Sequence, residues 1–304
     1  MDTNSVSPMP ELAPIAEFDK TPPTPPEETL PIDDLPPPPT TVTVHEEKLK
    51  EEEHRHYEEQ EEWGCGNWME YTFVVIVACI LLLGSVGLTI FWVMSYRGGF
   101  GWRDANNPEK QFNLHPVLMV AGFITFSGFS ILLYRICRCC RRIYVKLLHT
   151  VFHALAIPCV AIGFIAVLEY HKYRNIPNFY SLHSWLGFVT MGLFAIQFVV
   201  GFFSFLILLC CQSATSAFRA ALVPIHASFG LTTFMLAIAT CLTGLTEKVF
   251  TMPGGFGGSK LPNDIIVVNV LGMSLVGLAV VFNYSLRKEE LRYRAHLPVI
   301  EEPM

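Results

Sequence analysis

The chain has 304 residues, of which 51% are hydrophobic and only 16% are charged. A chain of this length would usually form two soluble domains, but the composition argues against that and indicates a membrane protein. The net charge of −6 at pH 7 comes mostly from the N-terminal segment, and nothing in the chain indicates a nucleic-acid partner.

Residues 1–62 form a polar tail that we expect to be disordered and cytosolic, without a signal peptide. Its first part is rich in proline (PTPPEE, LPPPPT), which favours an extended chain. Its second part, VHEEKLKEEEHRHYEEQEE, is strongly acidic and has no apolar stripe. A solvated tail is the simpler interpretation, and a docking segment for a trafficking partner is the alternative.

Six apolar stretches follow, and each is close to or above the ~20 residues that a helix needs to cross a bilayer. They are too long and too apolar for the strands of a membrane barrel. The stretches cover 69–94, 115–134, 146–168, 184–211, 222–246 and 265–286. We therefore predict an all-α membrane protein with six transmembrane helices over residues 63–286, of which spans two to five form a four-helix bundle, and a C-terminal tail over 287–304.

Basic residues in the short loops predict the orientation in the membrane. Ten lie on the side that holds the loop after span two, the loop after span four and the C-terminal tail, and seven lie on the opposite side. The densest cluster is RICRCCRRIYVK, after span two. No cysteine falls in a loop on the far side, which fits a reducing compartment on the side of this cluster. We therefore expect both termini to be cytosolic.

Histidines recur near the ends of four consecutive spans, where an ionisable side chain is costly and usually functional. His115 opens span two, His149 lies near the start of span three, His183 opens span four and His226 opens span five. Because successive spans run in opposite directions, His115 and His183 should lie at one depth near the far face, and His149 and His226 at one depth near the cytosolic face. Two facing imidazoles in an apolar bundle can hold the iron of a b-type haem. His153, one turn from His149, is the alternative ligand.

Other interpretations of these histidines remain open. Any one of them alone would more often be an interfacial or hydrogen-bonded side chain. Zinc would need three or four ligands at one depth, whereas each leaflet offers two obvious histidines. Glycines would give a flat ring room beside the helices or would simply permit helix packing. These glycines are Gly122, Gly128, Gly187, Gly192 and Gly230.

Cations precede the two histidines on the cytosolic side. Lys146 lies three residues before His149, and Arg219 lies seven residues before His226. Arg142 also precedes His149, by about two helical turns. These cations could serve haem propionates, an anionic electron donor or only the positive-inside rule.

Several stretches within residues 69–286 match one known pattern, and they are HPVLM, SILLYRICR, KLLHTVFH, EYH, NFYSLHSW and PIH. In these stretches the chain resembles the cytochrome b561 family of transmembrane ascorbate-dependent oxidoreductases. SILLYRICR departs modestly from the usual ending of that motif but keeps Tyr134 and Arg135.

The resemblance implies two b haems, one bound by His149 and His226 near the cytosol and one by His115 and His183 near the far side. It also implies a cytosolic ascorbate site, lined by Arg142, Lys146 and Arg219, because cations attract the ascorbate anion. The opposite site would be lined by His171, Asn178, Phe179 and Tyr180, where a histidine can take up a proton.

We therefore expect an enzyme that passes electrons from cytosolic ascorbate through both haems to monodehydroascorbate or a ferric chelate on the far side. An inside-negative potential favours outward movement of negative charge by about 2.3 kcal/mol per 100 mV. The resemblance also implies a homodimer, in a plasma, secretory-vesicle or endolysosomal membrane. Two alternatives predict other observations: a histidine-based metal-ion transporter would show metal flux without haem absorbance, and a haem subunit of a quinol-oxidising complex would depend on quinone.

Overall fold

The computed structural model describes residues 41–104, 106–137, 140–211, 214–252 and 262–288. The chain divides into two units, Met1–Glu58 and Glu59–Met304; the elements discussed below belong to the second, except that α1 begins in the first. Every regular element within the described ranges is a helix, which confirms the predicted fold class.

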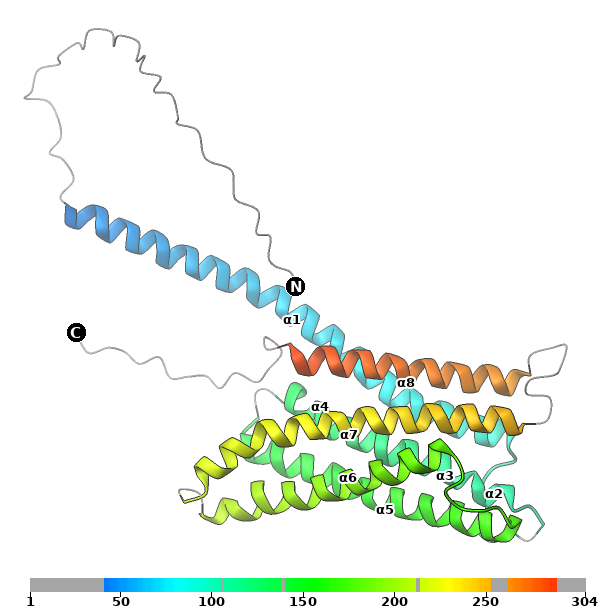
Figure 1. The fold of residues 1–304 in the computed structure, drawn as a ribbon. Helices are drawn as coiled ribbons and strands as arrows, with labels where there is room; N and C mark the ends of the chain where they lie inside the picture. The colour runs from blue at the N-terminus through cyan, green and yellow to red at the C-terminus, as the bar shows by residue number, and fades with distance from the viewer. Residues whose placement is uncertain (1–40, 105, 138–139, 212–213, 253–261, 289–304) are drawn as a thin grey trace, which may run out of the picture. The chain divides into compact units, whose positions relative to one another are not determined.

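Six helical segments in the described ranges are long and apolar enough to cross a membrane, as predicted (Figure 1). Five of these segments are single helices or parts of one, while the second consists of several consecutive helices. The single helices are α1 (Thr41–Tyr96), α5 (Arg142–Arg174), α6 (Leu182–Phe205), α7 (Ser216–Thr251) and α8 (Asn263–Arg287). The second span consists of α2 (Glu109–Phe112), α3 (Leu114–Met119), η2 (Val120–Phe126) and α4 (Ser127–Ile136).

The helix α1 begins at Thr41, within the tail that we expected to be disordered up to residue 62. The acidic stretch is therefore helical here. Its many glutamates and lysines are good helix formers. The proline-rich stretch lies outside the described residues, as does most of the C-terminal tail, so the proposed domain boundaries remain predictions.

Several helices run past the apolar stretches that predicted them. The helix α5 continues to Arg174, where Asn175 in the left-handed conformation (φ 55°) ends it, as a C-terminal cap commonly does. Span four is shorter than predicted, since α6 ends at Phe205 and a 3-10 turn, η3, covers Ile207–Cys211. Hydropathy detects apolar composition and does not register such changes of backbone.

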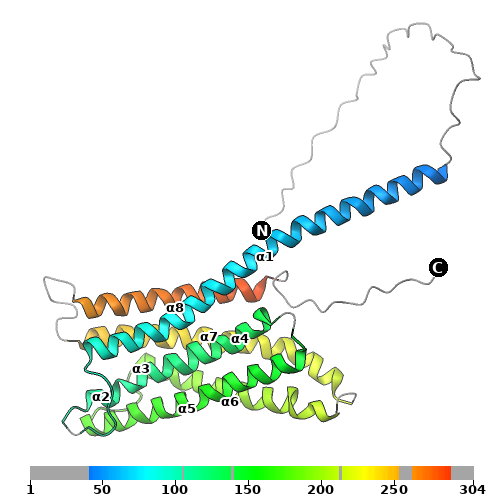
Figure 2. The same cartoon turned by 180° about the vertical axis from the view of Figure 1, so that it is seen from behind.

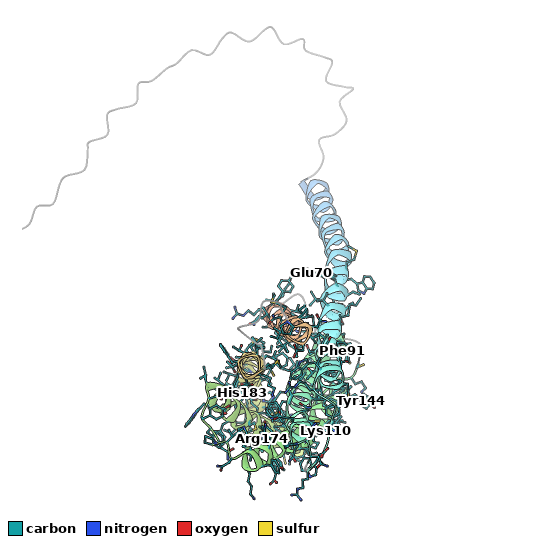
Figure 3. The ribbon with its side chains drawn as sticks, turned by 90° about the vertical axis from the view of Figure 1, so that its right-hand side faces the viewer. Glu70, Phe91, Lys110, Tyr144, Arg174 and His183 are labelled. Carbon is teal, nitrogen blue, oxygen red and sulfur yellow. The ribbon has the colours of Figure 1, made fainter. Side chains whose placement is uncertain are left out.

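Within the second unit, the helices of the second span pack against α5, and α6 packs against α7. The helix α8 lies along α7 (Figure 2). Viewed along the helices, α8 and the membrane-spanning part of α1 lie on one side of the other four (Figure 3). Buried side chains such as Leu82, Ile124, Leu275 and Phe282 join these layers in one apolar core.

The second span contains one wide, π-helical turn at Val120–Phe126. The hydroxyl of Ser127 donates to the carbonyl oxygen of Gly122 at 3.1 Å, five residues earlier. A side chain at Gly122 would meet the carbonyl of Ala156 and a Cβ on α5 at 3.1 Å, so the two backbones approach closely here. Wide turns of this kind are frequent at functional sites, and this one turns the residues of α4 relative to His115.

Candidate functional site

The four predicted histidines meet in two pairs, each formed by two helices. The rings of His115 on α3 and His183 on α6 have centroids 6.0 Å apart. The rings of His149 on α5 and His226 on α7 have centroids 6.4 Å apart. A metal bound between two imidazoles, at about 2 Å from each nitrogen, holds the ring centres roughly 6.3 Å apart. Both separations fit such an ion, and the apolar surroundings fit a porphyrin around it.

The ring orientations at the His115–His183 pair are set by hydrogen bonds to neighbouring helices. His115 Nδ1 lies 3.1 Å from the carbonyl oxygen of Gly163 on α5. His183 Nδ1 lies 2.9 Å from the carbonyl oxygen of Thr240 on α7. A carbonyl oxygen can only accept, so Nδ1 carries the proton and Nε2 keeps its lone pair. Histidines that ligate metals are usually held in this way.

His149 has the same kind of support, and this bears on the choice between His149 and His153. His149 Nδ1 lies 2.9 Å from the carbonyl oxygen of Ser130 on α4 and 2.8 Å from its hydroxyl. His153 lies deeper, with its ring 4.6 Å from that of His149, and its buried Nδ1 has no partner among the described residues. The geometry favours His149 as a ligand. His226 Nδ1 is likewise buried without a partner in the described part of the chain.

Two glycines that the sequence did not single out lie directly against ligand candidates. A Cβ at Gly244 on α7 would lie 2.7 Å from Cε1 of His183, and one at Gly201 on α6 would lie 2.8 Å from Cε1 of His226. The glycines predicted to make room behave differently. Gly122 and Gly128 pack against neighbouring helices, Gly187 has ordinary contact with Thr240, and Gly192 and Gly230 have no atom within 4 Å.

A cavity of about 940 Å³ opens beside the His149–His226 pair, with walls from α4, α5, α6 and α7. Its size is near the top of the range of ~300–1,000 Å³ that is typical of ligand and cofactor pockets. The three cations predicted for the donor site, Arg142, Lys146 and Arg219, all line it. The structure therefore brings the predicted cations and the predicted cytosolic-side histidines into one cavity.

Tyr134 and Arg135 line the same cavity, although no role of their own was predicted for them. The Tyr134 ring is 5.2 Å from that of His149. Arg135 is only 7% exposed, and its Nη2 donates to the carbonyl oxygen of Leu286 at 2.9 Å. A buried guanidinium in the wall adds positive charge to the cavity that the three cations also line.

The residues predicted for the opposite site gather where α5 ends and the loop to α6 begins: His171 lies in the last turn of α5, and Asn178, Phe179 and Tyr180 lie in the loop. His171 Nδ1 lies 3.0 Å from the side-chain oxygen of Asn178, and the rings of His171 and Tyr180 are 6.2 Å apart. Phe179 has a positive φ of 56°, and its carbonyl accepts from the indole of Trp185 at 3.1 Å. The loop thus folds back against the last turn of α5 and brings Asn178 and Tyr180 beside His171.

Tyr180 links this turn to α7. Its hydroxyl donates to a carboxylate oxygen of Glu247 at 2.5 Å. Burial, together with this hydrogen bond, raises the pKa of Tyr180 to about 12, so the phenol stays protonated at every physiological pH. Tyr180 can donate a hydrogen bond but cannot act as a base.

No group of three or more His, Cys, Asp or Glu side chains within the described ranges is placed to hold a metal ion by itself.

The family model described as "Eukaryotic cytochrome b561" matches residues 114–252. That range contains all four paired histidines.

Three relatives show the extent of the similarity. The plasma membrane ascorbate-dependent reductase CYBRD1 of Xenopus laevis is 37% identical over 209 residues, which is 67% of this chain and 71% of the relative. The lysosomal membrane ascorbate-dependent ferrireductase CYB561A3 of Homo sapiens is 38% identical over 219 residues, 68% of this chain and 86% of the relative. The transmembrane ascorbate-dependent reductase CYB561 of Sus scrofa is 34% identical over 218 residues, 72% and 83% of the two chains.

Proposed function

The cytochrome b561 family is the family to which this chain belongs, and from that premise we propose that it carries electrons across a membrane from ascorbate to an acceptor on the other side. The observation that supports this most directly is the presence of two histidine pairs at two depths, with ring separations of 6.0 and 6.4 Å. The names of the relatives, which are ascorbate-dependent reductases and a ferrireductase, support the same reaction class.

The family implies haem b, and we propose two per chain. His149 and His226 would hold one, and His115 and His183 the other, each through Nε2. Bound haem supplies a one-electron couple. The chain fixes the imidazoles of His115, His183 and His149 in advance through carbonyls that accept from Nδ1. Aromatic walls such as Phe123 and Phe194 keep water away from the cavity.

The cytosolic donor site in this proposal is the charged end of the cavity. Arg142, Lys146 and Arg219 line it. Their positive charge attracts the ascorbate monoanion and stabilises the monodehydroascorbate radical anion that remains after one electron and one proton have left. The basic excess of the adjacent loops favours a cytosolic position for this end, with both termini on the same side.

The acceptor site in this proposal is the turn on the opposite face. His171 and Asn178 offer hydrogen-bonding groups at its surface, with Tyr180 and Phe179 beside them. An imidazole there can release or take up a proton as the acceptor gains an electron. Monodehydroascorbate or a ferric chelate would be the acceptor. We further propose a homodimer in the plasma membrane, a secretory vesicle or an endolysosomal membrane, since both plasma and lysosomal membranes occur in the names of relatives.

An absorbance titration of the purified protein tests the proposal. We expect about two haems per chain, reduction on adding ascorbate, and reoxidation on adding a ferric chelate. One haem or none would contradict the proposed site, and metal flux without haem absorbance would favour a transporter instead. His183→Ala should remove one haem and stop transfer while the protein still inserts, and His45→Ala in the tail is the matched control that should retain both.

A further inference from the structure

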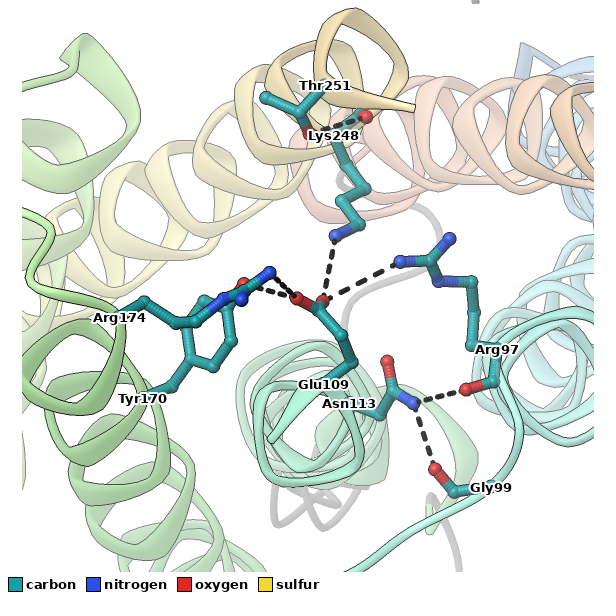
Figure 4. A network of polar contacts seen from close by, with 8 residues as sticks. All are labelled: Arg97, Gly99, Glu109, Asn113, Tyr170, Arg174, Lys248 and Thr251. Atoms are coloured by element: carbon teal, nitrogen blue, oxygen red, sulfur yellow. Dashed lines mark hydrogen bonds and ion pairs between the residues drawn. The ribbon is translucent and has the colours of Figure 1, made fainter. Parts of the chain in front are cut away.

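The carboxylate of Glu109 is the centre of a polar cluster on the far face, formed by α2, α5, α7 and the loop after α1 (Figure 4). Its Oε1 accepts from the hydroxyl of Tyr170 at 2.7 Å and from Nη2 of Arg174 at 3.1 Å. Two further cations approach its other oxygen, Oε2, namely Arg97 at 3.8 Å and Lys248 at 3.9 Å. Three cations therefore share one carboxylate.

Arg97 and Lys248 are poorly compensated by this arrangement. Their side chains are only 17% and 16% exposed, and charges that have lost most of their water need close partners. Both distances to Glu109 exceed the 2.7–2.9 Å that is typical of a charge-assisted hydrogen bond. The Nε of Arg97 is also buried without a hydrogen-bond partner in the described part of the chain.

The neighbouring charges do not remove the excess. On this face Lys110 pairs with Asp104 at 3.3 Å, and Arg103 lies 4.0 Å from Glu169, so these four groups balance. Glu247, next to Lys248 in the chain, is engaged by Tyr180. Within the described part of the chain, the three cations of the cluster still outnumber Glu109 and Glu247 together by one positive charge.

The cluster lies one side chain away from the His115–His183 pair. The ammonium of Lys248 is 4.3 Å from the centre of the Phe112 ring, and that ring is 6.2 Å from the ring of His115. Phe112 thus separates Lys248 from the proposed haem ligand His115 by a single aromatic layer.

We propose that Arg97 and Lys248 form an anion site for a carboxylate group beside the His115–His183 pair. The inference rests on the proposed function. A carboxylate has two oxygens in one plane, which suits a guanidinium and an ammonium together, and it would replace the distant Glu109 as the close partner of both cations. Two sources have this chemistry: a propionate of the haem held by that pair, and a carboxylate of a soluble acceptor such as ferric citrate.

The test compares Lys248→Met and Arg97→Met with Lys110→Met, a matched control that removes a cation of the same loop region. If the carboxylate is a propionate, the propionate band in the resonance Raman spectrum shifts in the first two variants. At a fixed applied potential, the reduced-to-oxidised ratio of one haem then falls at least threefold. If the carboxylate belongs to the acceptor, the KM for ferric citrate rises at least threefold, while the KM for hexaammineruthenium(III), a cation, does not rise. The control leaves all these readouts unchanged.

Glu109→Gln is an independent test in which each readout should change in the opposite direction, because this variant removes a negative charge that competes for the two cations. It should raise the reduced-to-oxidised ratio of the same haem or lower the KM for ferric citrate, and its near-identical shape keeps the test valid if Lys248→Met fails to fold. The proposed anion site is wrong if variants with full haem content show no change in the propionate band, in the reduced-to-oxidised ratio of the haem or in the KM for ferric citrate. A wild-type protein without ascorbate-reducible haem overturns the proposed function instead.

Discussion

Replacing Gly244 by alanine should remove one haem and leave the other in place. Gly244 lies on α7 against the ring of His183, and an added Cβ would lie 2.7 Å from Cε1, 2.9 Å from Nδ1 and 3.2 Å from Nε2. Carbon atoms in contact stay about 3.5 Å apart, so the ring has to move by roughly 0.8 Å. A metal–ligand bond tolerates a deviation of about 0.2 Å.

The ring cannot move away freely, because a hydrogen bond already ties it to the same helix. His183 Nδ1 is hydrogen-bonded to the Thr240 carbonyl at 2.9 Å, one turn before Gly244 on the same helix, so moving the ring also weakens that bond. A weakened helix does not explain haem loss, since alanine is the better helix former by about 1 kcal/mol.

Gly201→Ala is the corresponding change at the other pair. Its Cβ would lie 2.8 Å from Cε1 of His226, and the haem of the His149–His226 pair should be lost instead. Gly192→Ala is the matched control, because no atom lies within 4 Å of the added methyl group.

The assay has two measurements: the haem-to-protein ratio of each variant, and the optical spectrum of the haem that remains. We expect about one haem per chain in each single variant, with different remaining spectra, and about two in Gly192→Ala. Two haems in Gly244→Ala, with the wild-type spectrum, would show that His183 is not a ligand in its observed position and would refute the reasoning.

Three further changes test other parts of the structure. Lys146→Met should raise the KM for ascorbate at least fivefold with both haems retained, whereas Lys172→Met on the opposite face should not; unchanged ascorbate kinetics would remove Lys146 from the donor site. Since the pKa of Tyr180 is raised to about 12, ultraviolet difference titration of the wild type against Tyr180→Phe should reveal the extra phenolate only above about pH 11, and ionisation near the ordinary pKa of about 10 would contradict this. Asn113 is fully buried and donates two 2.9 Å hydrogen bonds to backbone carbonyls of the loop after α1, so Asn113→Leu should destabilise the protein by about 1–3 kcal/mol, and an unchanged thermal unfolding midpoint would disprove that role.

Much of the fold and the histidine pairing could be predicted from the sequence, because both depend on simple quantities. A membrane span is detected by its length and apolar content. Once the spans are known, their directions are known relative to one another, because each span crosses the membrane in the direction opposite to the one before it. The depth of a histidine then depends only on its distance from the end of its span. This is why His115 and His183, which are 68 positions apart in the sequence, could be expected at one level.

What the sequence could not supply is the rotation of each helix about its axis. Gly201 and Gly244 matter because of the helix face on which they lie, and span assignment does not determine that face. The π-helical turn at Val120–Phe126 changes the facing of α4 without any hydropathy signal. Glu109, close to Lys110 and Asp104 in a polar loop, looked like an ordinary surface charge until the fold brought Lys248 towards it.

The hydrogen bonds to the ring nitrogens predict which haem is held more tightly. The rings of His115 and His183 both donate to carbonyls on helices other than their own, so both are oriented before any ligand binds. In the other pair only His149 has such a partner, whereas His226 Nδ1 has none among the described residues. Losing a partner of this kind typically weakens metal binding by about 10–100-fold.

Haem transfer from the protein to excess apomyoglobin should therefore proceed in two phases that differ at least tenfold in rate. Gly201→Ala, which should already lack the haem of the His149–His226 pair, should show only the slow phase, because the pair with two anchored rings remains. Gly244→Ala should show only the fast phase. If the fast phase disappears in Gly244→Ala instead, the carbonyl partners do not control how firmly each pair holds its iron.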